Sequence, residues 1–450
     1  MTRMGLAALV GLAAIVLGST AGRGQDDTSR TVVISIDGLS PSAYAEASGS
    51  DMPTLQRLAA EGARASGVVG VFPTVTYPSH TTMITGVPPA VHGIYNNRML
   101  DPEGRSNGAW YWYARDIETR TLVEAVREAG LRAAAIYWPV TVGMDIDALL
   151  PEFSRSTHPE NLSLLRALSR PSTLIDDLEA ERGRALPSPL DDAARAEMAA
   201  WVFRVHQPHL LLLHIFETDT IQHVYGPDSP QARTARVEAD RNLAVVLDAI
   251  DDTDLRDRTN IVVVSDHGFL PVGRQLQANA VFKEKGWLRV DARGRVTEWD
   301  AYFQPSGGSA FVFLDDGAGE DLRERVSDVL EELARDPANG IERILDGDEL
   351  RALGADPRAA FAIDMRSGFY TGAAHDRLLG EPPGKGGHGF HPSRPELHAS
   401  LVMTGPDVPW SGDLGVVRMT QIAPTIAAWF GVRLSPEADA PLALTPAIGR

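Results

Sequence analysis

Cysteine is absent from the 450-residue sequence, and this absence limits the chemistry open to the chain. Without thiols there are no disulfide bonds, no thiolate metal ligands and no lipid-modified cysteine. A chain of this length can bury a sufficient core without disulfides. Any metal site must therefore be built from histidine, aspartate, glutamate and hydroxyl groups.

An excess of positive charge is also missing. Lys and Arg total 42 against 60 Asp and Glu, which gives a formal net charge of −18. Such a surface repels polyanions, so bulk nucleic acid is disfavoured as a partner. A small substrate that carries phosphate would need local cations to offset the same field, which is an argument for bound metal.

Long hydrophobic runs are missing apart from one near the N-terminus. Residues 4–18 read MGLAALVGLAAIVLG, with Arg3 before them and small residues after them. The run is short and rich in Gly and Ala, so we expect residues 1–25 to be a secretory signal peptide that is cleaved between Ala21 and Gln25. An uncleaved anchor is the alternative. We therefore expect export to the periplasm or the extracellular space, with no membrane span after cleavage.

The rest of the chain alternates strand-like apolar runs with helical patterns. Several of the strand-like runs are apolar on both faces, which favours a mainly parallel sheet covered by helices on both sides, an α/β fold. We expect residues 26–450 to form one catalytic domain. Within it, residues of about 150–205 and about 270–385 fit the alternation poorly and are interpreted as insertions or a cap.

Three of the apolar strands lead to acidic residues. Asp37 follows a strand predicted from residue 30, Asp219 follows the strand at 209–216, and Asp266 follows the strand that begins at 259. In open α/β sheets, ligands bind beyond the carboxyl ends of the strands. We therefore expect these acids to gather at one edge of the sheet.

Histidines complete a candidate metal centre. His223 lies four residues after Asp219, His267 follows Asp266 directly, and His388 lies in the glycine-rich run GKGGHGF. Three Asp and three His can build two metal sites that keep open positions for substrate. Each fragment has an ordinary alternative, since Asp-Gly is often a turn and a lone D-x-x-x-H seldom binds metal. The ordered combination carries the prediction.

Thr74 is the candidate nucleophile. It lies between Pro73 and Pro78 in FPTVTYP, just before a predicted short helix. A hydroxyl at a helix N-terminus lies beside amides that favour phosphate, and metal coordination would lower its pKa and orient it. Taken alone, Thr74 fits better as a turn residue that bonds to its own backbone.

The motifs together resemble those of a known enzyme family. VISIDG, FPTVTYPSHTTMITG with HGIYNNRM, FETDTIQHVYGP, VVVSDHGF and GGHGF are similar in order and spacing to the nucleotide pyrophosphatase/phosphodiesterase family of the alkaline phosphatase superfamily. The resemblance covers roughly residues 30–270 and 384–430. It implies an alkaline-phosphatase-like α/β/α fold and two bound Zn²⁺, for which Mn or Fe are alternatives.

The resemblance also implies a role for each candidate residue. One zinc would be held by four residues, with the threonine as nucleophile: Asp37, Thr74, Asp266 and His267. The other zinc would be held by three residues: Asp219, His223 and His388. Asn97 would bind a non-bridging phosphoryl oxygen, and Asn96 is the neighbouring alternative.

Two departures from the family pattern bear on the substrate. Thr218 and Gln222 stand where the family commonly has Pro and Gly, and we expect them to alter the substrate rim while sparing the ligands. Threonine-type monoesterases carry a Lys-x-Arg pair after a middle strand, whereas the equivalent AIYWPVTVGMD has no cation; its Tyr137 and Trp138 offer stacking surface or internal packing. We therefore expect a type I phosphodiesterase or nucleotide pyrophosphatase. A phosphomonoesterase is the alternative, and a non-catalytic exported binding protein is a distant one.

Overall fold

The computed structural model describes residues 28–45, 51–106, 108–153 and 161–444. The expected signal peptide lies outside the described residues. Within the described ranges, no helix combines the length and the apolar character needed to cross a bilayer.

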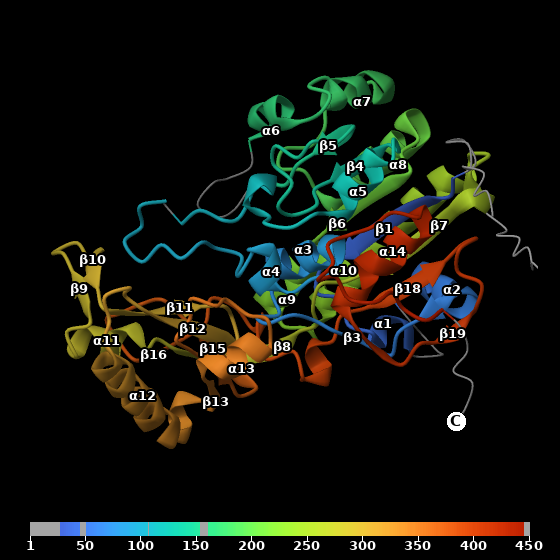
Figure 1. The fold of residues 1–450 in the computed structure, drawn as a ribbon. Helices are drawn as coiled ribbons and strands as arrows, with labels where there is room; N and C mark the ends of the chain where they lie inside the picture. The colour runs from blue at the N-terminus through green and yellow to red at the C-terminus, as the bar shows by residue number, and fades with distance from the viewer. Residues whose placement is uncertain (1–27, 46–50, 107, 154–160, 445–450) are drawn as a thin grey trace, which may run out of the picture.

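An eight-stranded sheet in the order β19-β2-β18-β7-β1-β6-β4-β5 forms the centre of the larger lobe (Figure 1). β1 pairs in parallel with β6 and with β7, and β4 pairs in parallel with β6 and with β5. β18 runs antiparallel to β7 and β2. The mainly parallel sheet confirms the predicted α/β class. The strand bounds are β1 Arg30–Ile36, β2 Ala63–Arg64, β4 Ala133–Ile136, β5 Ala148–Leu150, β6 Leu210–Ile215, β7 Thr259–Val264, β18 Leu401–Thr404 and β19 Gly412–Asp413.

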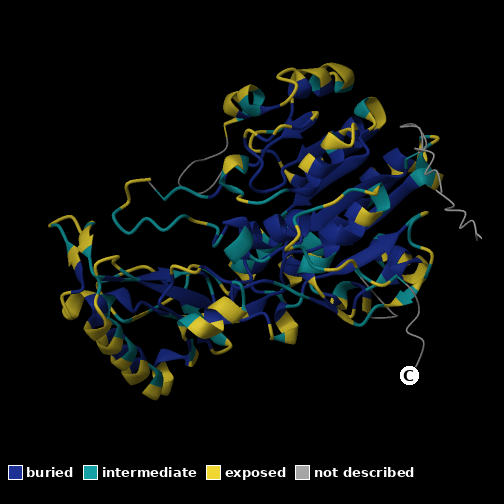
Figure 2. Ribbon diagram, in the orientation of Figure 1, coloured by how far each residue is buried: buried dark blue, intermediate teal, exposed yellow. Residues whose placement is uncertain are grey.

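Helices cover both faces of this sheet. In β1, Val32 and Ile34 belong to the apolar cluster on one face, while Val33 belongs to the cluster on the other, as strand alternation requires. The first face is covered by α2 (Pro53–Glu61), α8 (Asp192–His206) and α10 (Pro230–Asp251). The second is covered by α3 (Thr76–Thr85), α5 (Leu122–Glu128) and α14 (Ile422–Phe430). Strands buried on both faces explain the continuous apolar runs in the sequence (Figure 2).

Helix boundaries follow local signals in the sequence. The Ser229 hydroxyl accepts a hydrogen bond from the Ala232 amide at the start of α10, and Pro230 occupies the first turn. α14 ends at Gly431, whose φ of 67° is a left-handed conformation that glycine adopts without strain.

Residues 161–206 form helices that belong largely to the main lobe. α6 (Leu162–Leu168) and α7 (Leu174–Arg182) lie at its top in Figure 1, and α8 packs against β6 and α10. Trp201 and Phe203 of α8 are buried in the apolar cluster that β1 and β6 share. The segment interpreted as an insertion therefore includes α8, which is one of the helices that cover the central sheet.

Residues of about 270–385 fold into a second lobe with its own core. An antiparallel sheet in the order β11-β12-β14-β13 packs against α12 (Glu320–Arg335), whose outer face is exposed (Figure 2). The strand bounds are β8 Leu270–Leu276, β11 Ala301–Pro305, β12 Ser309–Leu314, β13 Ile341–Leu345, β14 Phe361–Met365 and β15 Gly368–Thr371. Phe72 of the main lobe meets Phe311 of β12 edge to face, with 5.6 Å between ring centroids. The second lobe therefore supports the turn that carries Thr74.

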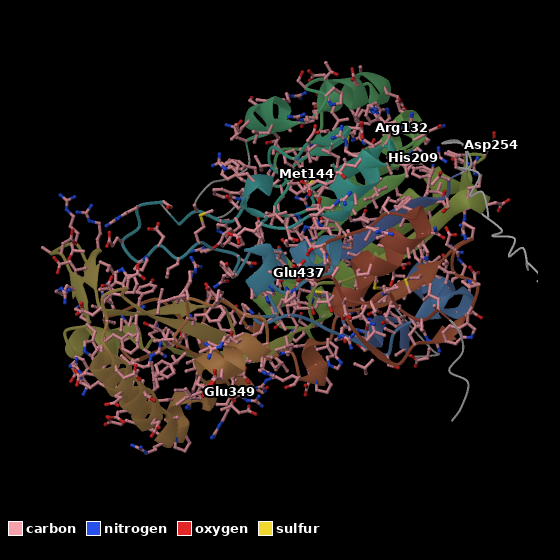
Figure 3. All side chains as sticks on the ribbon, viewed as in Figure 1. Arg132, Met144, His209, Asp254, Glu349 and Glu437 are labelled. Carbon is pink, nitrogen blue, oxygen red and sulfur yellow. The ribbon has the colours of Figure 1, made fainter. Side chains whose placement is uncertain are left out.

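Polar pairing at the other end of the sheet is structural. Arg132 and His209, labelled in Figure 3, precede β4 and β6 at their amino ends. The Arg132 amide donates to Nδ1 of His209 at 3.1 Å. This contact ties the two strand starts together and lies at the opposite end of the strands from the acids described below.

Candidate metal and phosphoryl site

The three predicted acids meet at the carboxyl edge of the central sheet. Asp37 follows β1 directly, and Asp266 follows β7 after one intervening residue. Asp219 lies in the first turn of α9 (Glu217–Tyr225), which begins just beyond β6. Because β1 lies between β6 and β7 in parallel register, the ends of these strands are neighbours. The sheet topology therefore brings together acids that are far apart in the sequence.

Protein donors hold one oxygen of two of these acids and leave the other oxygen free. Nε2 of His214 lies 3.1 Å from Oδ2 of Asp37. The amides of Gly38 and His267 donate to Oδ1 of Asp266 at 3.0 and 3.1 Å.

The remaining carboxylate oxygens are buried and accept no hydrogen bond from the protein. They are Oδ1 of Asp37, Oδ1 of Asp219 and Oδ2 of Asp266. Buried carboxylate oxygens without partners are costly unless they face a cation. This observation fits a metal centre and would be hard to explain for an ordinary core.

Two histidines direct their Nε2 atoms toward Asp219. Nδ1 of His223 lies 2.9 Å from the Gly386 carbonyl, and Nδ1 of His388 lies 3.0 Å from the Thr74 carbonyl. Since a carbonyl only accepts, each Nδ1 carries a proton, and in the neutral ring Nε2 is the nitrogen left to bind a metal. These Nε2 atoms lie 3.3 Å (His223) and 3.5 Å (His388) from Oδ1 of Asp219. Asp219, His223 and His388 are thus one group that could hold an ion.

A second possible metal group comprises Asp37, Asp219 and His267. Nε2 of His267 lies 3.5 Å from Oδ1 of Asp37 and 3.2 Å from Oδ2 of Asp266. The resemblance assigns Asp219 to one ion and Asp266 to the other. In the structure, Asp219 belongs to both groups, and Asp266 lies beside His267. The two groups are therefore adjacent and have Asp219 in common.

Burial sets the protonation of this centre. Burial, then the charges of Asp266 and Asp219, raise the pKa of Asp37 well above its usual range. Burial lowers the pKa of His267 and of His388 to about 3, so both rings are neutral, the form that binds metal. Burial opposes charge on Asp219, but His223 and the other imidazoles outweigh it and hold the pKa of that carboxyl below its usual range. Burial opposes charge on His223 as well, but Asp219 outweighs it and raises the pKa of His223 above its usual value. Crowded, buried carboxylates beside imidazoles suit a divalent cation.

Thr74 lies beside the same centre and is fully buried. Its hydroxyl donates to the Phe390 carbonyl at 3.0 Å and accepts from the Gly389 amide at 3.1 Å. Its own carbonyl faces Nδ1 of His388. The hydroxyl therefore bonds to the loop that carries His388, and a contact with metal would replace its bond to Phe390.

The two asparagines have different surroundings. Asn96 is buried, donates to Ser306 of the second lobe at 2.7 Å, and accepts from the Asn97 amide. Oδ1 of Asn97 accepts from the amide of Tyr77 in the first turn of α3, at 2.8 Å. Among the described residues, the Asn97 side-chain nitrogen has no hydrogen-bond partner. Asn97 is therefore the better placed of the two to donate to a ligand.

The two departures from the family pattern have structural roles. The Thr218 hydroxyl donates to the Asp37 carbonyl at 2.6 Å, and Nε2 of Gln222 donates to the Gly38 carbonyl at 3.0 Å. Both side chains are buried. They tie α9 to the turn after β1 beneath the ligands, and Gln222 also lines a cavity beside Gly38. Their expected effect on the substrate rim stays a prediction. Tyr137 and Trp138 are also fully buried, so they pack internally and offer no stacking surface.

Sequence reasoning left a buried pair of histidines behind the ligands without a role. His214 reaches Asp37, and its ring lies 4.4 Å from that of His80. His80 Nε2 lies 2.8 Å from the Ser35 hydroxyl, and its Nδ1 lies 2.8 Å from the Thr76 carbonyl. The sequence position of His214 could have indicated this role, because His214 lies near the end of a strand that pairs with β1.

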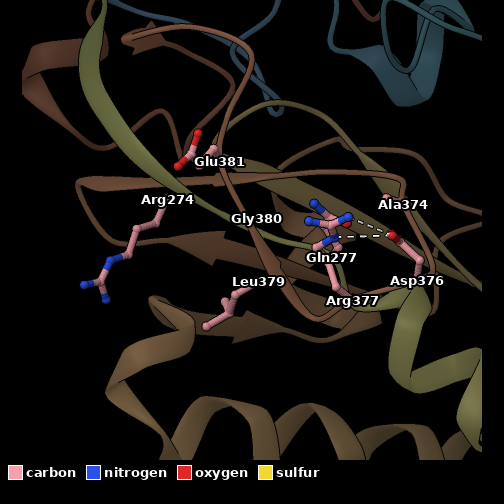
Figure 4. A pocket seen from close by; sticks show the side chains of 8 residues that line it. All are labelled: Arg274, Gln277, Ala374, Asp376, Arg377, Leu379, Gly380 and Glu381. Atoms are coloured by element: carbon pink, nitrogen blue, oxygen red, sulfur yellow. Dashed lines mark hydrogen bonds and ion pairs between the residues drawn. The ribbon is translucent and has the colours of Figure 1, made fainter.

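One cavity lies away from the candidate centre, and another lies beside it. A cavity of about 700 Å³ lies on the second lobe, lined by Arg274, Gln277, Asp376, Arg377 and Glu381 among others (Figure 4). None of the predicted site residues lines it. A smaller cavity of about 260 Å³ shares His223 as part of its wall.

The match to a known family follows the motifs. A model of the family described as type I phosphodiesterase / nucleotide pyrophosphatase matches residues 31–359. The chain belongs to this phosphodiesterase family. The resemblance inferred from the sequence motifs is thereby confirmed.

Curated relatives match this chain over a shared region. Human ectonucleotide pyrophosphatase/phosphodiesterase family member 1 is 24% identical over 255 residues, which are 54% of this chain and 24% of that protein. A venom phosphodiesterase of Macrovipera lebetinus is 25% identical over 254 residues, which are 54% of this chain and 26% of that protein. The matched region is thus about a quarter of the length of these relatives.

Solved structures share the fold of this chain. Murine ectonucleotide pyrophosphatase/phosphodiesterase 5 superposes with a TM-score of 0.62 at 19% identity, covering 90% of this chain and 96% of that one. An inactive threonine-to-alanine variant of the murine protein, in complex with AMP, superposes with a TM-score of 0.63 at 18% identity and covers 91% and 96% of the two chains. This likeness establishes the alkaline-phosphatase-like architecture.

We expect His214→Phe to weaken metal binding. The phenyl ring keeps the volume but removes the contact that fixes Asp37, and loss of such an outer contact typically costs about ten- to a hundredfold in metal affinity. Equilibrium dialysis with zinc measures the change. His92→Phe is the matched control, since His92 is equally buried but contacts Thr82. Equal zinc affinity in the two variants would remove His214 from the support of the site.

Proposed function

We propose that the chain is a two-zinc phosphodiesterase or nucleotide pyrophosphatase that acts through a phospho-threonine at Thr74. The observation that carries the proposal is the convergence of unpartnered carboxylate oxygens and imidazole nitrogens at the sheet edge. Carboxylate and imidazole ligands suit zinc. The ligands are the seven residues expected from the motifs: Asp37, Thr74, Asp219, His223, Asp266, His267 and His388.

Bound zinc ions would supply positive charge that polarises the phosphoryl group and stabilises the attacking and leaving oxygens. The chain's own groups then do the following. The Thr74 oxygen attacks phosphorus while the phosphorus–oxygen bond to the leaving group breaks, and the proton that Thr74 donates to the Phe390 carbonyl in the structure is balanced by the one that departs on the leaving alcohol. The Gly389 amide continues to donate to this oxygen and stabilises its negative charge. The Asn97 side-chain nitrogen donates to a non-bridging phosphoryl oxygen.

Two features support this choice of nucleophile and substrate. The threonine-to-alanine variant of the murine relative is described as inactive and holds AMP. By the resemblance, Thr-type monoesterases carry cations after this strand, whereas the segment after β4 in this chain has Tyr137 and Trp138, both buried. A phosphodiester, which carries one negative charge on its phosphoryl group, needs less cationic support than a monoester. The substrate is therefore a small diester or nucleotide-like phosphate. The expected signal peptide supports a periplasmic or extracellular location.

A metal and substrate test addresses the proposal directly. We expect the purified protein to hold two zinc equivalents and to hydrolyse the p-nitrophenyl ester of thymidine 5′-monophosphate faster than p-nitrophenyl phosphate. Chelation should abolish both reactions, and zinc should restore them. Faster release from p-nitrophenyl phosphate would establish the monoesterase alternative. Bound zinc with no turnover of either ester would favour a binding protein.

A further inference from the structure

The cavity beside His223 is lined mainly by apolar side chains. Apart from His223 and two glycines, it is lined by Val224, Val272, Tyr370, Pro382 and Pro383. No Asp, Glu, Lys or Arg lines it, in a chain whose net charge is −18. Val224 is 50% exposed although it directly follows a candidate metal ligand. An apolar surface at this position favours an uncharged apolar group and disfavours a phosphate.

The loop that forms one wall is held in place before any ligand arrives. The Lys385 amide donates to the His223 carbonyl at 2.7 Å. A Cβ at Gly384 would lie 2.1 Å from the His223 carbonyl oxygen, and one at Gly386 would lie 2.4 Å from the Gln222 carbonyl oxygen. The two glycines therefore let the loop lie flat against the end of α9, and the two prolines limit its remaining freedom.

Tyr370 forms another wall next to the catalytic centre. A Cβ at Gly387 would lie 2.4 Å from its ring, so the ring covers the backbone just before His388. Partial burial, and then the negative charge of Asp219, raise the pKa of Tyr370, which keeps the phenol neutral. Among the described residues, its hydroxyl has no hydrogen-bond partner.

A series of contacts connects Thr74 to the cavity through two imidazoles. The Thr74 carbonyl meets His388, Nε2 of His388 lies 3.1 Å from Nε2 of His223, and Nδ1 of His223 meets Gly386 in the cavity wall. The two imidazoles thus link Thr74 to the cavity wall through direct contacts. In phosphoryl transfer the attacking and leaving oxygens are roughly in line, so the leaving group departs on the side away from the nucleophile.

We propose that this cavity is a leaving-group subsite that selects phosphodiesters of apolar alcohols, with an alkyl chain or an aryl ring as the group bound. The proposal rests on the proposed function. In the step, the Thr74 oxygen forms a bond to phosphorus, the phosphorus–oxygen bond to the alcohol breaks, and the alcohol leaves with one proton. Water then hydrolyses the phospho-threonine, restores the hydroxyl and releases the monoester. The volume of about 260 Å³ exceeds the ~150 Å³ that admits benzene.

Methyl hexyl phosphate tests this assignment through its products. Release of hexanol leaves methyl phosphate, while release of methanol leaves hexyl phosphate, and both alcohols have similar acidity. Because burial of each methylene gains about fourfold, we expect methyl phosphate to exceed hexyl phosphate by at least about tenfold. Phosphorus NMR measures the product ratio, which does not depend on how much enzyme is active.

Substitutions of residues that line the cavity test whether it causes the product ratio. Val224→Ser and Tyr370→Ser should bring the product ratio toward one, while Tyr370→Phe, which keeps the ring, should preserve it. Val205→Ser is the matched control, since Val205 is 54% exposed at the end of α8. A wild-type ratio near one, or an unchanged ratio in both serine variants, would overturn the subsite.

A binding measurement separates this proposal from the proposed function. Calorimetry should show that hexylphosphonate binds the zinc-loaded wild-type protein at least about tenfold more tightly than methylphosphonate, and that Val224→Ser reduces this advantage. If the diester gives no product while the chain-length advantage persists, the proposed function fails and the apolar subsite stands. If the diester is cleaved without any chain-length advantage in binding or products, the subsite fails and the hydrolase stands.

Discussion

Thr74→Ala is expected to reduce phosphodiester turnover by at least about a thousandfold while both metal equivalents stay bound. The variant removes the oxygen that would attack phosphorus. Metal is retained because the Thr74 hydroxyl bonds to Phe390 and Gly389, whereas the unpartnered carboxylates and imidazoles are untouched. Turnover of a nitrophenyl diester and metal content by mass spectrometry are measured on the same preparation.

Controls for this experiment lie in the neighbouring helix. Thr85→Ala removes a buried hydroxyl that donates to the Thr81 carbonyl within α3, so it should leave turnover close to the wild-type value. Thr74→Ser keeps a hydroxyl and should keep part of the activity. Near-normal turnover in Thr74→Ala would eliminate this residue as the nucleophile and would leave a metal-activated water as the attacking group.

Asp219→Asn is expected to cost more bound metal than any single histidine change. Asp219 belongs to both candidate groups, and the neutral amide offers a weaker ligand without the charge that attracts the cation. His388→Ala removes a residue of one group and should lower the metal content toward one equivalent. We expect Asp219→Asn to fall below that value and to lose most of the thermal stabilisation that zinc gives the wild-type protein.

A second buried carboxylate provides the comparison for Asp219. Asp240 accepts from the amides of Thr54 and Leu55 at the start of α2, at 3.0 and 2.9 Å. Asp240→Asn should lower the melting temperature by weakening this cap without changing the metal content. Two retained equivalents in Asp219→Asn, or in His388→Ala, would remove the altered residue from the ligand set.

The placement of the acids shows how far motif reasoning reaches. The strands before Asp37 and Asp266 were predictable because both are apolar runs that stop at polar residues. That the two acids would be neighbours followed from the rule that ligands gather at the carboxyl edge of a parallel sheet. The pairing of β1 with both β6 and β7 bears out this expectation. The assignment of each ligand to one ion remains a prediction.

Features that depend on packing between distant segments were not predictable from local patterns. His214 belongs to none of the sequence motifs, yet it contacts Asp37 across 177 positions of sequence. Thr218 and Gln222 likewise bond to the turn after β1, across 181 and 184 positions of sequence. Periodicity reports which face of an element is apolar, whereas these roles depend on which polar groups another element brings near.

The sequence by itself determined the fold class, the family and the residue types available for chemistry. Absent cysteine, clustered Asp and His motifs, and apolar strands are one-dimensional properties, and each limits the chemistry directly. Tertiary structure decided which oxygens remain without donors, which imidazole nitrogens carry protons, and which apolar side chains line the cavity beside His223. The physical reason is that hydrogen bonding, desolvation and cavity shape depend on distances between groups, and those distances exist only after strands remote in sequence have paired.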